Sequence, residues 1–293
     1  LAEDHCSLIT RAHNIRKAFD SVKWEYLLDL LQRRGFPSKF RDWITALLSS
    51  SSSRIILNGI ASCPIKHGKG LRQGDPISPL LFVIAIDPLQ KILDVATKKG
   101  LLHKIRGRGA MMRTSLYADD AAVFLAPIKQ DVDNFASILR GFGDVTGLCT
   151  NFQKSSVVPI RCNHLDLGRL TQSLPAARTS FPLRYLGLPL SVWKLKLVDL
   201  QFLVDKVASK LSTYDGQNIT TIGRTALVKS VITSQVVYPA TPLVFPPTIL
   251  HSVNKLEELS FGPFGQDNEG QMQGELGVYM FASHLSMEVF GYS

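Results

Sequence analysis

The sequence predicts an α+β fold, in which helices and β-hairpins are mixed along the chain. Asn58-Gly59 lies between two β-prone runs, and the adjacent acids Asp119 and Asp120 lie between two others. Both arrangements are typical of hairpins. Stretches with helical spacing of apolar residues occur before, between and after these hairpins. Because strands and helices do not alternate one for one, the pattern argues against a parallel sheet.

Two amphipathic helices are expected near the start of the chain. Leucines recur with helical spacing from Val22 to Arg34, and Gly35 and Pro37 stop this helix. The second helix is expected from Ser38 to Leu48, and the serine run after it reads as a loop.

The Asn58-Gly59 hairpin is expected to pair residues 54–57 with residues 63–66. Residues 68–75 are rich in glycine and basic residues. Pro76 and Pro79 then open a long apolar helix that is expected to reach Lys98.

Residues 113–125 are expected to form a hairpin that exposes Asp119 and Asp120 at its turn. Apolar, β-prone residues flank the tetrad Tyr117-Ala118-Asp119-Asp120 on both sides. An ordinary Asp-rich turn is the alternative, since turns favour Asp. Two acids held between buried strands repel each other, and a divalent cation relieves that repulsion.

The second half of the chain is expected to be mainly helical. Helices are predicted over residues 130–145, 195–211 and 223–236, and Gly187 and Pro189 close a short apolar segment. Residues 237–247 are proline-rich and are not expected to form a regular helix.

Composition describes a basic globular protein. The 293 residues are 45% hydrophobic and 19% charged, with a net charge of +9 and a pI near 9.4, which suits an anionic polymer as partner. The apolar run from Leu80 to Ile86 is too short to span a bilayer. The four cysteines have no C-x-x-C spacing and are expected to be reduced core thiols, with disulfides or zinc as the alternatives: Cys6, Cys63, Cys149 and Cys162.

The ends of the chain look like those of a piece cut from a longer frame. Leu1 to Asp4 shows no signal-peptide pattern and no initiator Met, and the tail beyond residue 260 has little helical or strand periodicity. The expected location is intracellular, in the nucleus or cytoplasm.

The glycine-rich run from Gly70 to Pro76 has the chemistry of a ligand-binding loop. Its glycines allow the backbone to approach a ligand, and Arg72 and Gln73 supply donors to phosphates and base edges. The helix that follows presents its positive N-terminal end to the same place. A plain turn before a helix is the alternative.

Five segments, in order, resemble reverse transcriptases of plant non-LTR (LINE-type) retrotransposons. Residues 16–24 resemble the first palm motif, residues 70–82 the second, the Tyr117–Asp120 tetrad the third, residues 147–155 the fourth, and residues 185–190 the segment that leads into the thumb. The likeness spans roughly residues 8–260. The chain is accordingly expected to be an N-terminally truncated, degenerate member.

The resemblance implies a right-hand polymerase with an antiparallel palm sheet, packed helices, partial fingers and a helical, thumb-like part. The expected domains are a palm with partial fingers over residues 1–190, a helical thumb or connection over residues 191–260, and a divergent tail over residues 261–293. The implied partners are an RNA template, a DNA primer and deoxynucleotides, with no membrane.

The implied reaction is nucleotidyl transfer assisted by two Mg²⁺ ions, or by Mn²⁺. Asp119 would bridge the metals and Asp120 would support them. Phe19 would pack under the sugar, where a simple core phenylalanine is the alternative. Arg72, Gln73 and Gly74 would line the nucleotide and template pocket. Lys154 would donate to the leaving pyrophosphate, and a solvated lysine is the alternative.

The chain departs from the family at one metal-binding position. The third carboxylate should stand six residues before Asp20, where this chain has Asn14. An amide offers an oxygen but no charge, so the metal pair loses one anchor. Asp20 itself is expected to cap a helix. Asn14 is expected to lie beside Asp119 and Asp120.

Three functions remain open on the sequence. The first is a polymerase-derived domain whose activity is weak or lost. The second is a non-catalytic RNA- or DNA-binding module, and the third is a protein similar to an intron maturase. Magnesium-dependent primer extension separates the first from salt-sensitive binding without synthesis.

Overall fold

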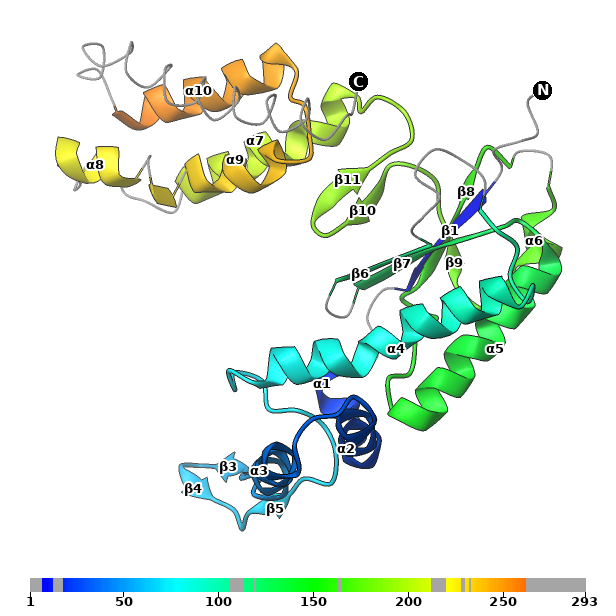
Figure 1. Cartoon of the computed structure of the whole chain (residues 1–293). Helices are drawn as coiled ribbons and strands as arrows, with labels where there is room; N and C mark the ends of the chain where they lie inside the picture. Colours follow the sequence, from blue (N-terminus) through cyan, green and yellow to red (C-terminus); the bar gives the residue numbers. More distant parts are fainter. Residues whose placement is uncertain are drawn as a thin grey trace. The chain divides into compact units, whose positions relative to one another are not determined.

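The computed structural model describes residues 7–12, 18–105, 113–117, 120–162, 165–211, 220–227, 230–231 and 233–261. The chain divides into two compact units, residues 1–180 and residues 181–293 (Figure 1). Each unit buries a hydrophobic core of its own.

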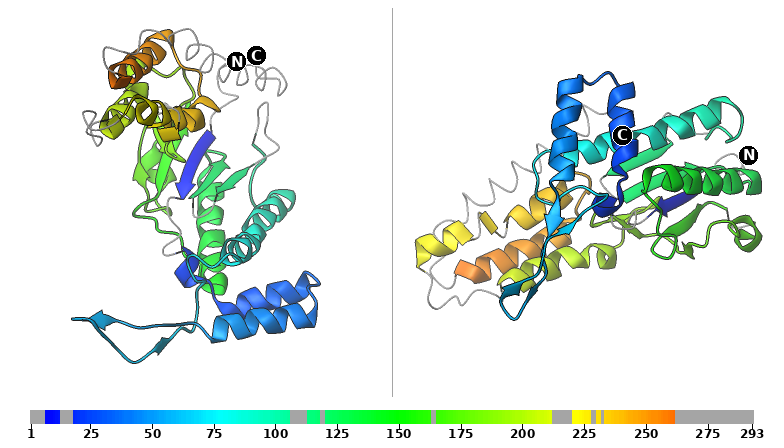
Figure 2. Two further views of the ribbon diagram at one scale, coloured as in Figure 1. Left: turned by 90° about the vertical axis from the view of Figure 1, so that its left-hand side faces the viewer. Right: turned by 90° about the horizontal axis from the view of Figure 1, so that it is seen from below.

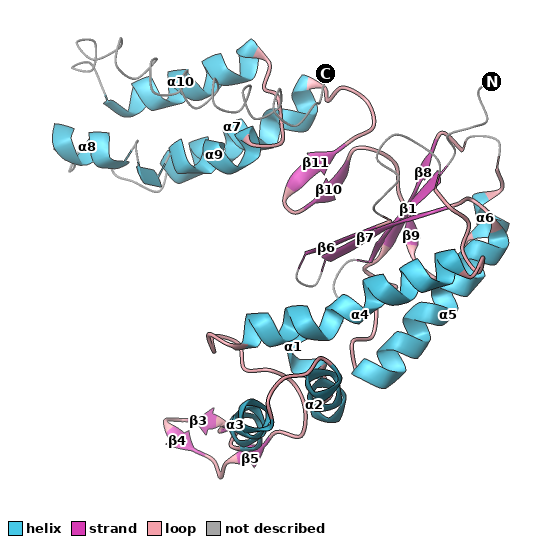
Figure 3. Ribbon diagram, in the orientation of Figure 1, coloured by secondary structure: helices cyan, strands magenta, loops and turns pink. Residues whose placement is uncertain are grey.

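A five-stranded sheet forms the centre of the first unit (Figure 3). Its strands, in spatial order, are β6 (Thr114–Tyr117), β7 (Asp120–Leu125), β1 (Ser7–Ala12), β8 (Ser156–Ile160) and β9 (Ala177–Arg178). Strand β1 is central and pairs antiparallel with both β7 and β8. The N-terminal segment is therefore built into the middle of the sheet.

The expected antiparallel sheet is in fact mixed. Strand β9 pairs parallel with β8. Parallel neighbours need a crossover connection, and the segment between β8 and β9 supplies it, with the short helix α6 (Leu167–Leu170). Asp166 caps α6 by accepting hydrogen bonds from the amides of Gly168 and Arg169.

Helices α4 (Ser78–Lys98) and α5 (Lys129–Thr146) pack on the sheet and share one core with it (Figure 1). Phe82 of α4 and Phe135 of α5 are fully buried in that core, together with Leu125 of β7. The helix predicted from the prolines to Lys98 is confirmed, and so is the helix predicted over residues 130–145.

Three helices precede α4: α1 (Ala18–Ser21), α2 (Trp24–Arg33) and α3 (Ser38–Ser49). Leu27 and Leu31 form the buried stripe of α2, one turn apart, as its leucine spacing predicts. The predicted bounds of both long helices are confirmed within two residues at each end.

A two-stranded ribbon follows α3, built from β2 (Ser52–Ser53), β3 (Ile56–Leu57), β4 (Ile60–Ala61) and β5 (Ile65–Lys66). The predicted turn is confirmed, because Asn58 and Gly59 both have positive φ, at 50° and 80°. The predicted partner is wrong: β3 pairs with β4 directly across the turn, and β5 pairs with β2. A two-residue turn pairs the residues directly before it with those directly after it, so residues 60–61, and not residues 63–66, pair with residues 56–57.

The second unit begins with a hairpin, β10 (Leu183–Tyr185) and β11 (Leu188–Leu190). Its two turn residues, Leu186 and Gly187, also have positive φ. The helices that follow are α7 (Leu197–Leu211), α8 (Thr221–Leu227), α9 (Thr233–Ala240) and α10 (Pro247–Phe261). Their core includes Leu203 of α7, Val236 of α9 and Val253 of α10.

Helix α7 confirms the helix predicted over residues 195–211. The helix expected over residues 223–236 corresponds to most of α8 and the start of α9, while residues 228, 229 and 232 lie outside the described part. Residues 237–247 were expected to contain no regular helix, and this prediction is wrong at both ends of the segment. Pro239 lies in the last turn of α9, and Pro247 is the first residue of α10, where a missing N–H costs nothing.

The cysteines differ from the expected reduced core thiols. Cys63 and Cys149 are free but exposed, whereas Cys162 is buried and disulfide-bonded. Cysteine spacing carries no information on which pairs meet in space. Among the helices in the described residues, none is both long and apolar enough to cross a bilayer.

Candidate functional site: the strand ends and the glycine-rich loop

Three strand ends meet at one edge of the central sheet. The last residue of β1, Ala12, pairs with Ala121 of β7. One residue earlier, Arg11 pairs with Ala122 on one side and with Ser156, the first residue of β8, on the other. The segment that leaves β1 therefore starts beside the first residues of β7 and β8.

The acidic hairpin lies at this edge. Tyr117 of β6 pairs with Asp120 of β7, which confirms the predicted hairpin in the residues that the structure describes. The expected exposure of Asp120 at the turn is wrong, because Asp120 is already paired in β7 and is partly buried. The carboxylate of Asp120 is half-buried and belongs to the first residue of a strand. Ala118, Asp119 and Asn14 lie outside the described residues. Their places stay predictions.

A metal at this edge would need oxygen donors from several segments. Over the described residues, no three His, Cys, Asp or Glu side chains lie close enough to share an ion. Of the predicted donors, only Asp120 is described. Its position on a hydrogen-bonded strand fits the rigid oxygen donor that Mg²⁺ requires.

Lys154 lies in the turn that enters β8, at the same edge of the sheet. Its backbone amide donates to the carbonyl of Asn151 at 3.2 Å, and its side chain is exposed. Ser156, two positions later, pairs with Arg11. The sequence-predicted lysine therefore emerges near the end of β1 and is open to solvent.

The glycine-rich loop is tied to α1 and α2 by backbone hydrogen bonds. The amide of Gly70 donates to the carbonyl of Val22 at 2.8 Å, and the amide of Leu71 donates to that of Phe19 at 2.6 Å. The indole N–H of Trp24 donates to the carbonyl of Gly70 at 2.6 Å. The first and second sequence motifs therefore form one structural unit.

Only glycine fits at position 70. Its φ is +88°, and a Cβ there would lie 2.7–2.8 Å from backbone atoms of Asp20. Asp20 is the third residue of α1 and is exposed, so the expected capping role is wrong: it lies inside the short helix and not before it. The loop packs against the backbone of Asp20 at Gly70.

The fourth motif meets the same short helix. A Cβ at Gly147 would lie 2.0 Å from the carbonyl oxygen of Ser21, and the amide of Lys23 donates to the carbonyl of Thr146 at 2.9 Å. Gly147 also ends α5 with a φ of +84°. Residues 18–23 are thus held between the second and fourth motifs.

An open cavity of about 690 Å³ lies beside the loop. Arg72 and Gln73, both predicted to bind nucleotide or template, line it, and Gly74 follows directly after them. The other lining residues come from α1, from the base of the ribbon and from the glycine-rich loop itself: Asp20, Ser52, Ser53, His67, Gly68, Lys69, Gly70 and Leu71. Lys69 and His67 were not singled out by the sequence, although they flank the glycines.

Phe19 is half-buried and stacks on Phe82 of α4, with ring centroids 4.8 Å apart and an interplanar angle of 16°. One face of its ring is therefore occupied by the core. Its predicted role under a sugar stays a prediction.

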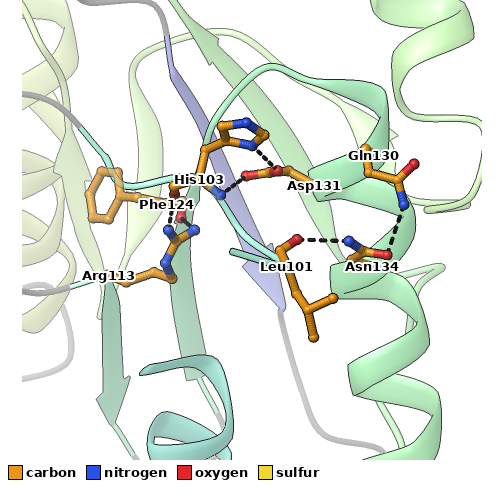
Figure 4. Close-up of polar contacts among 7 residues, drawn as sticks. All are labelled: Leu101, His103, Arg113, Phe124, Gln130, Asp131 and Asn134. Carbon is orange, nitrogen blue, oxygen red and sulfur yellow. Dashed lines mark hydrogen bonds and ion pairs between the residues drawn. The ribbon is translucent and has the colours of Figure 1, made fainter. Parts of the chain in front are cut away.

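A polar network with two buried side chains, Asp131 and Arg113, connects the acidic hairpin to α5 (Figure 4). Asp131 of α5 is fully buried and accepts two hydrogen bonds from His103: from its backbone amide at 2.9 Å and from its ring Nδ1 at 2.7 Å. Arg113, just before β6, donates to the carbonyl of His103 and, at 3.2 Å, to that of Phe124 in β7. These bonds connect the hairpin strands to α5.

Burial lowers the pKa of the Arg113 guanidinium, while Asp131 and Asp94 oppose the shift. A further hydrogen bond links α5 to the segment before Arg113: the side chain of Asn134 donates to the carbonyl of Leu101 at 2.7 Å (Figure 4). No spacing in the sequence marks Asp131, His103 and Arg113 as partners, since they come from three separate segments.

Comparison with known proteins agrees with the motif order. Residues 9–190 match the family model described as "Reverse transcriptase (RNA-dependent DNA polymerase)". The chain is 30% identical over 154 residues to the "Retrovirus-related Pol polyprotein from type-1 retrotransposable element R2" of Nasonia vitripennis, which covers 53% of this chain and 14% of that protein.

Two further relatives come from a vertebrate and a plant. The "Transposon TX1 uncharacterized 149 kDa protein" of Xenopus laevis is 26% identical over 231 residues, which are 76% of this chain and 17% of that protein. The "Uncharacterized mitochondrial protein AtMg01250" of Arabidopsis thaliana is 36% identical over 69 residues, which are 23% of this chain and 57% of that protein.

The chain thus spans 14% of the R2 polyprotein and 17% of the TX1 protein. The family model covers more than half of the chain, and its range contains β1, the glycine-rich loop and the acidic hairpin. This chain belongs to the reverse transcriptase (RNA-dependent DNA polymerase) family.

Proposed function

We propose that the chain is the RNA-directed DNA polymerase domain of a non-LTR (LINE-type) retrotransposon, of plant origin. Residues 1–190 act as the palm with partial fingers, residues 191–260 as the thumb or connection, and residues 261–293 as a divergent tail. The substrates are an RNA template, a DNA primer and deoxynucleotides, and the enzyme works inside the cell, in the nucleus or cytoplasm.

The observation that carries the proposal is the register at the sheet edge. Ala12 pairs with Ala121, next to Asp120, so the chain that runs on to Asn14 starts beside the acidic hairpin. In this proposal Asp119 and Asp120 hold Mg²⁺ or Mn²⁺, which supplies charge neutralisation at the phosphoryl group when bound. Lys154, at the same edge, meets the pyrophosphate.

The remaining predicted residues lie around α1. Arg72 and Gln73 line the cavity and contact the incoming nucleotide or the template, with Gly74 beside them, and Phe19 packs under the sugar. Gly70 fixes this loop on the backbone of Asp20. The two glycine contacts on α1 orient the nucleotide pocket.

Activity is weak or lost because Asn14 replaces a carboxylate. Removing one of three negative charges leaves the dication pair under-neutralised and loosely placed. Losing a partner that only orients a ligand already costs about 10–100-fold in metal affinity or activity. A non-catalytic nucleic-acid-binding module is the second candidate, favoured by the same substitution.

Primer extension on an RNA template tests the proposal. The unmodified chain, Asn14→Asp and the double variant Asp119→Asn with Asp120→Asn are compared in Mg²⁺ and in Mn²⁺. We expect little or no extension by the unmodified chain, more by Asn14→Asp, and none by the double variant.

Robust synthesis by the unmodified chain would show that Asn14 is tolerated. Salt-sensitive binding of the primer–template without synthesis in any of the three forms would favour the binding module instead.

A further inference from the structure

The ribbon formed by residues 52–66, called the arm below, exposes large aliphatic side chains. Ile55, Leu57 and Ile60 are 62%, 73% and 77% exposed. Leu57 pairs with Ile60, and side chains alternate between the faces of a strand, so these three lie on one face. Exposed apolar patches of this kind mark interaction sites.

The arm is held at its root. The ring of His67 bonds Ser51 through Nδ1 and Ser53 through Nε2, both at 2.8 Å, and its amide donates to the carbonyl of Ser51 at 3.0 Å. Midway, the amide of Ser62 donates to the carbonyl of Ile55 at 2.8 Å. The arm is thus hydrogen-bonded along its length and projects away from α2 and α3 (Figure 2).

The arm and the loop that follows it carry only positive charge, although Asp20 of α1 also lines the cavity at the arm's root. No Asp or Glu occurs from Trp43 to Gly74. The segment carries four exposed cations, and within the described part of the chain none of them forms an ion pair: Arg54, Lys66, Lys69 and Arg72. Lys69 and Arg72 line the cavity at the arm's root. A basic path therefore leads from the cavity onto the arm.

An isolated two-stranded ribbon is marginally stable in water, so a partner that covers the aliphatic face would stabilise it. That partner must offer apolar surface and negative charge together. Unpaired nucleic acid has both, because its bases present apolar faces and its backbone carries phosphates. Isoleucine and leucine are among the side chains that proteins insert between bases.

We propose that the arm binds the single-stranded stretch of the template that enters the cavity, with Leu57 and Ile60 against its bases and Arg54 and Lys66 against its phosphates. This inference rests on the proposed function. Single-stranded template suits the arm better than a duplex does, because the deep major groove of an A-form duplex hides its base edges from side chains.

Two labelled RNA–DNA hybrids test the inference by fluorescence anisotropy. One is blunt, and the other carries a 5′ RNA overhang of roughly eight nucleotides, within the range of single-strand site sizes. The apolar variant is Leu57→Ser with Ile60→Ser, and its control is Ile92→Ser with Val95→Ser on α4, where the side chains are 40% and 47% exposed. The charge variant is Arg54→Gln with Lys66→Gln, and its control is Lys98→Gln with Lys99→Gln.

The apolar variant should bind the overhang hybrid about tenfold more weakly and the blunt hybrid as the unmodified chain does. The charge variant should lower the salt slope on the overhang hybrid by about 1.4, because each lost single-strand phosphate contact removes about 0.7. Both controls should behave as the unmodified chain.

Two results would overturn the inference while leaving the proposed function intact. In the first, the apolar variant binds both hybrids as tightly as the unmodified chain. In the second, the unmodified chain self-associates in sedimentation experiments and the apolar variant does not, which would make the face a protein interface. Failure of the unmodified chain to bind either hybrid would overturn the proposed function as well.

Discussion

Asp131 and His103 are joined twice, because the buried carboxylate accepts from both the backbone amide and the ring Nδ1 of the same residue. The carbonyl of His103 in turn accepts a hydrogen bond from Arg113, whose guanidinium also reaches the carbonyl of Phe124. The acidic hairpin is therefore anchored through a carboxylate that lies on α5, outside every sequence motif.

Replacing this carboxylate should destabilise the protein. In Asp131→Asn the amide keeps one acceptor oxygen and turns its NH₂ toward a donor, so we expect the free energy of unfolding to fall by about 1–3 kcal/mol. Asp133→Asn is the control, since the Asp133 side chain is 37% exposed and its partners, Lys129 at 3.3 Å and Ser173, lie at the surface of α5 or beside it; its effect should be clearly smaller than that of Asp131→Asn. Urea unfolding measures both, and equal effects would contradict the anchoring role.

Three alanine substitutions separate close contact from backbone strain in the glycine-rich loop. Gly68→Ala has open space and no positive φ, so it should change stability by less than about 0.5 kcal/mol. Gly74→Ala has open space but a φ of +91° and should cost about 1–2 kcal/mol. Gly70→Ala adds contact with the backbone of Asp20 and should cost the most. Thermal unfolding gives the order, and Gly70→Ala matching Gly74→Ala would show that the contact is unimportant.

Gly147, in the fourth motif, and Gly35 allow a second comparison of backbone contact with backbone strain. Gly147 and Gly35 both follow helices with positive φ, at +84° and +79°, but only Gly147 packs against another backbone, that of Ser21. Gly147→Ala should therefore cost clearly more than the roughly 1 kcal/mol expected for Gly35→Ala. If chemical denaturation finds the two alike, α1 is not held by Gly147.

Tyr26 should make stability depend on alkaline pH. Burial raises its pKa from 10.0 to about 12, with Arg34 opposing the shift and Asp87 adding to it. The folded state holds this proton more tightly, so the stabilisation is complete below pH 10 and is lost as the pH rises through about 12. Spectrophotometric titration should show one of the seven tyrosines ionising late, and Tyr26→Phe should remove that step. Uniform titration near pH 10 in the folded protein would contradict this.

The sequence predicts the local elements of this fold well. Helical spacing around Leu27 and Leu31 and the Asn58-Gly59 turn are local signals, and each corresponds to the expected element. The parallel strand β9 and the crossover that leads to it were missed, because strand direction depends on where a connection returns and not on residue type.

The candidate site was predicted in part. The motifs identified Asp120, Arg72 and Gln73, which lie at the sheet edge and in the cavity wall. The loop glycines were expected to let the backbone approach a ligand, whereas Gly70 approaches the backbone of Asp20 in α1. No reason was predicted for Gly147, which approaches the carbonyl of Ser21 in the same helix. The hydrogen bonds from Trp24 to Gly70 and from His103 to Asp131 join residues far apart in the sequence, so no local sequence pattern predicts them.

Mn²⁺ binding followed by electron paramagnetic resonance tests the central claim, that the acidic hairpin is a metal site weakened by Asn14. The account predicts weak binding by the unmodified chain, at least about tenfold tighter binding by Asn14→Asp, and loss of the site in Asp119→Asn with Asp120→Asn. Equal affinity of the unmodified chain and Asn14→Asp, or unchanged binding in the double variant, would contradict it.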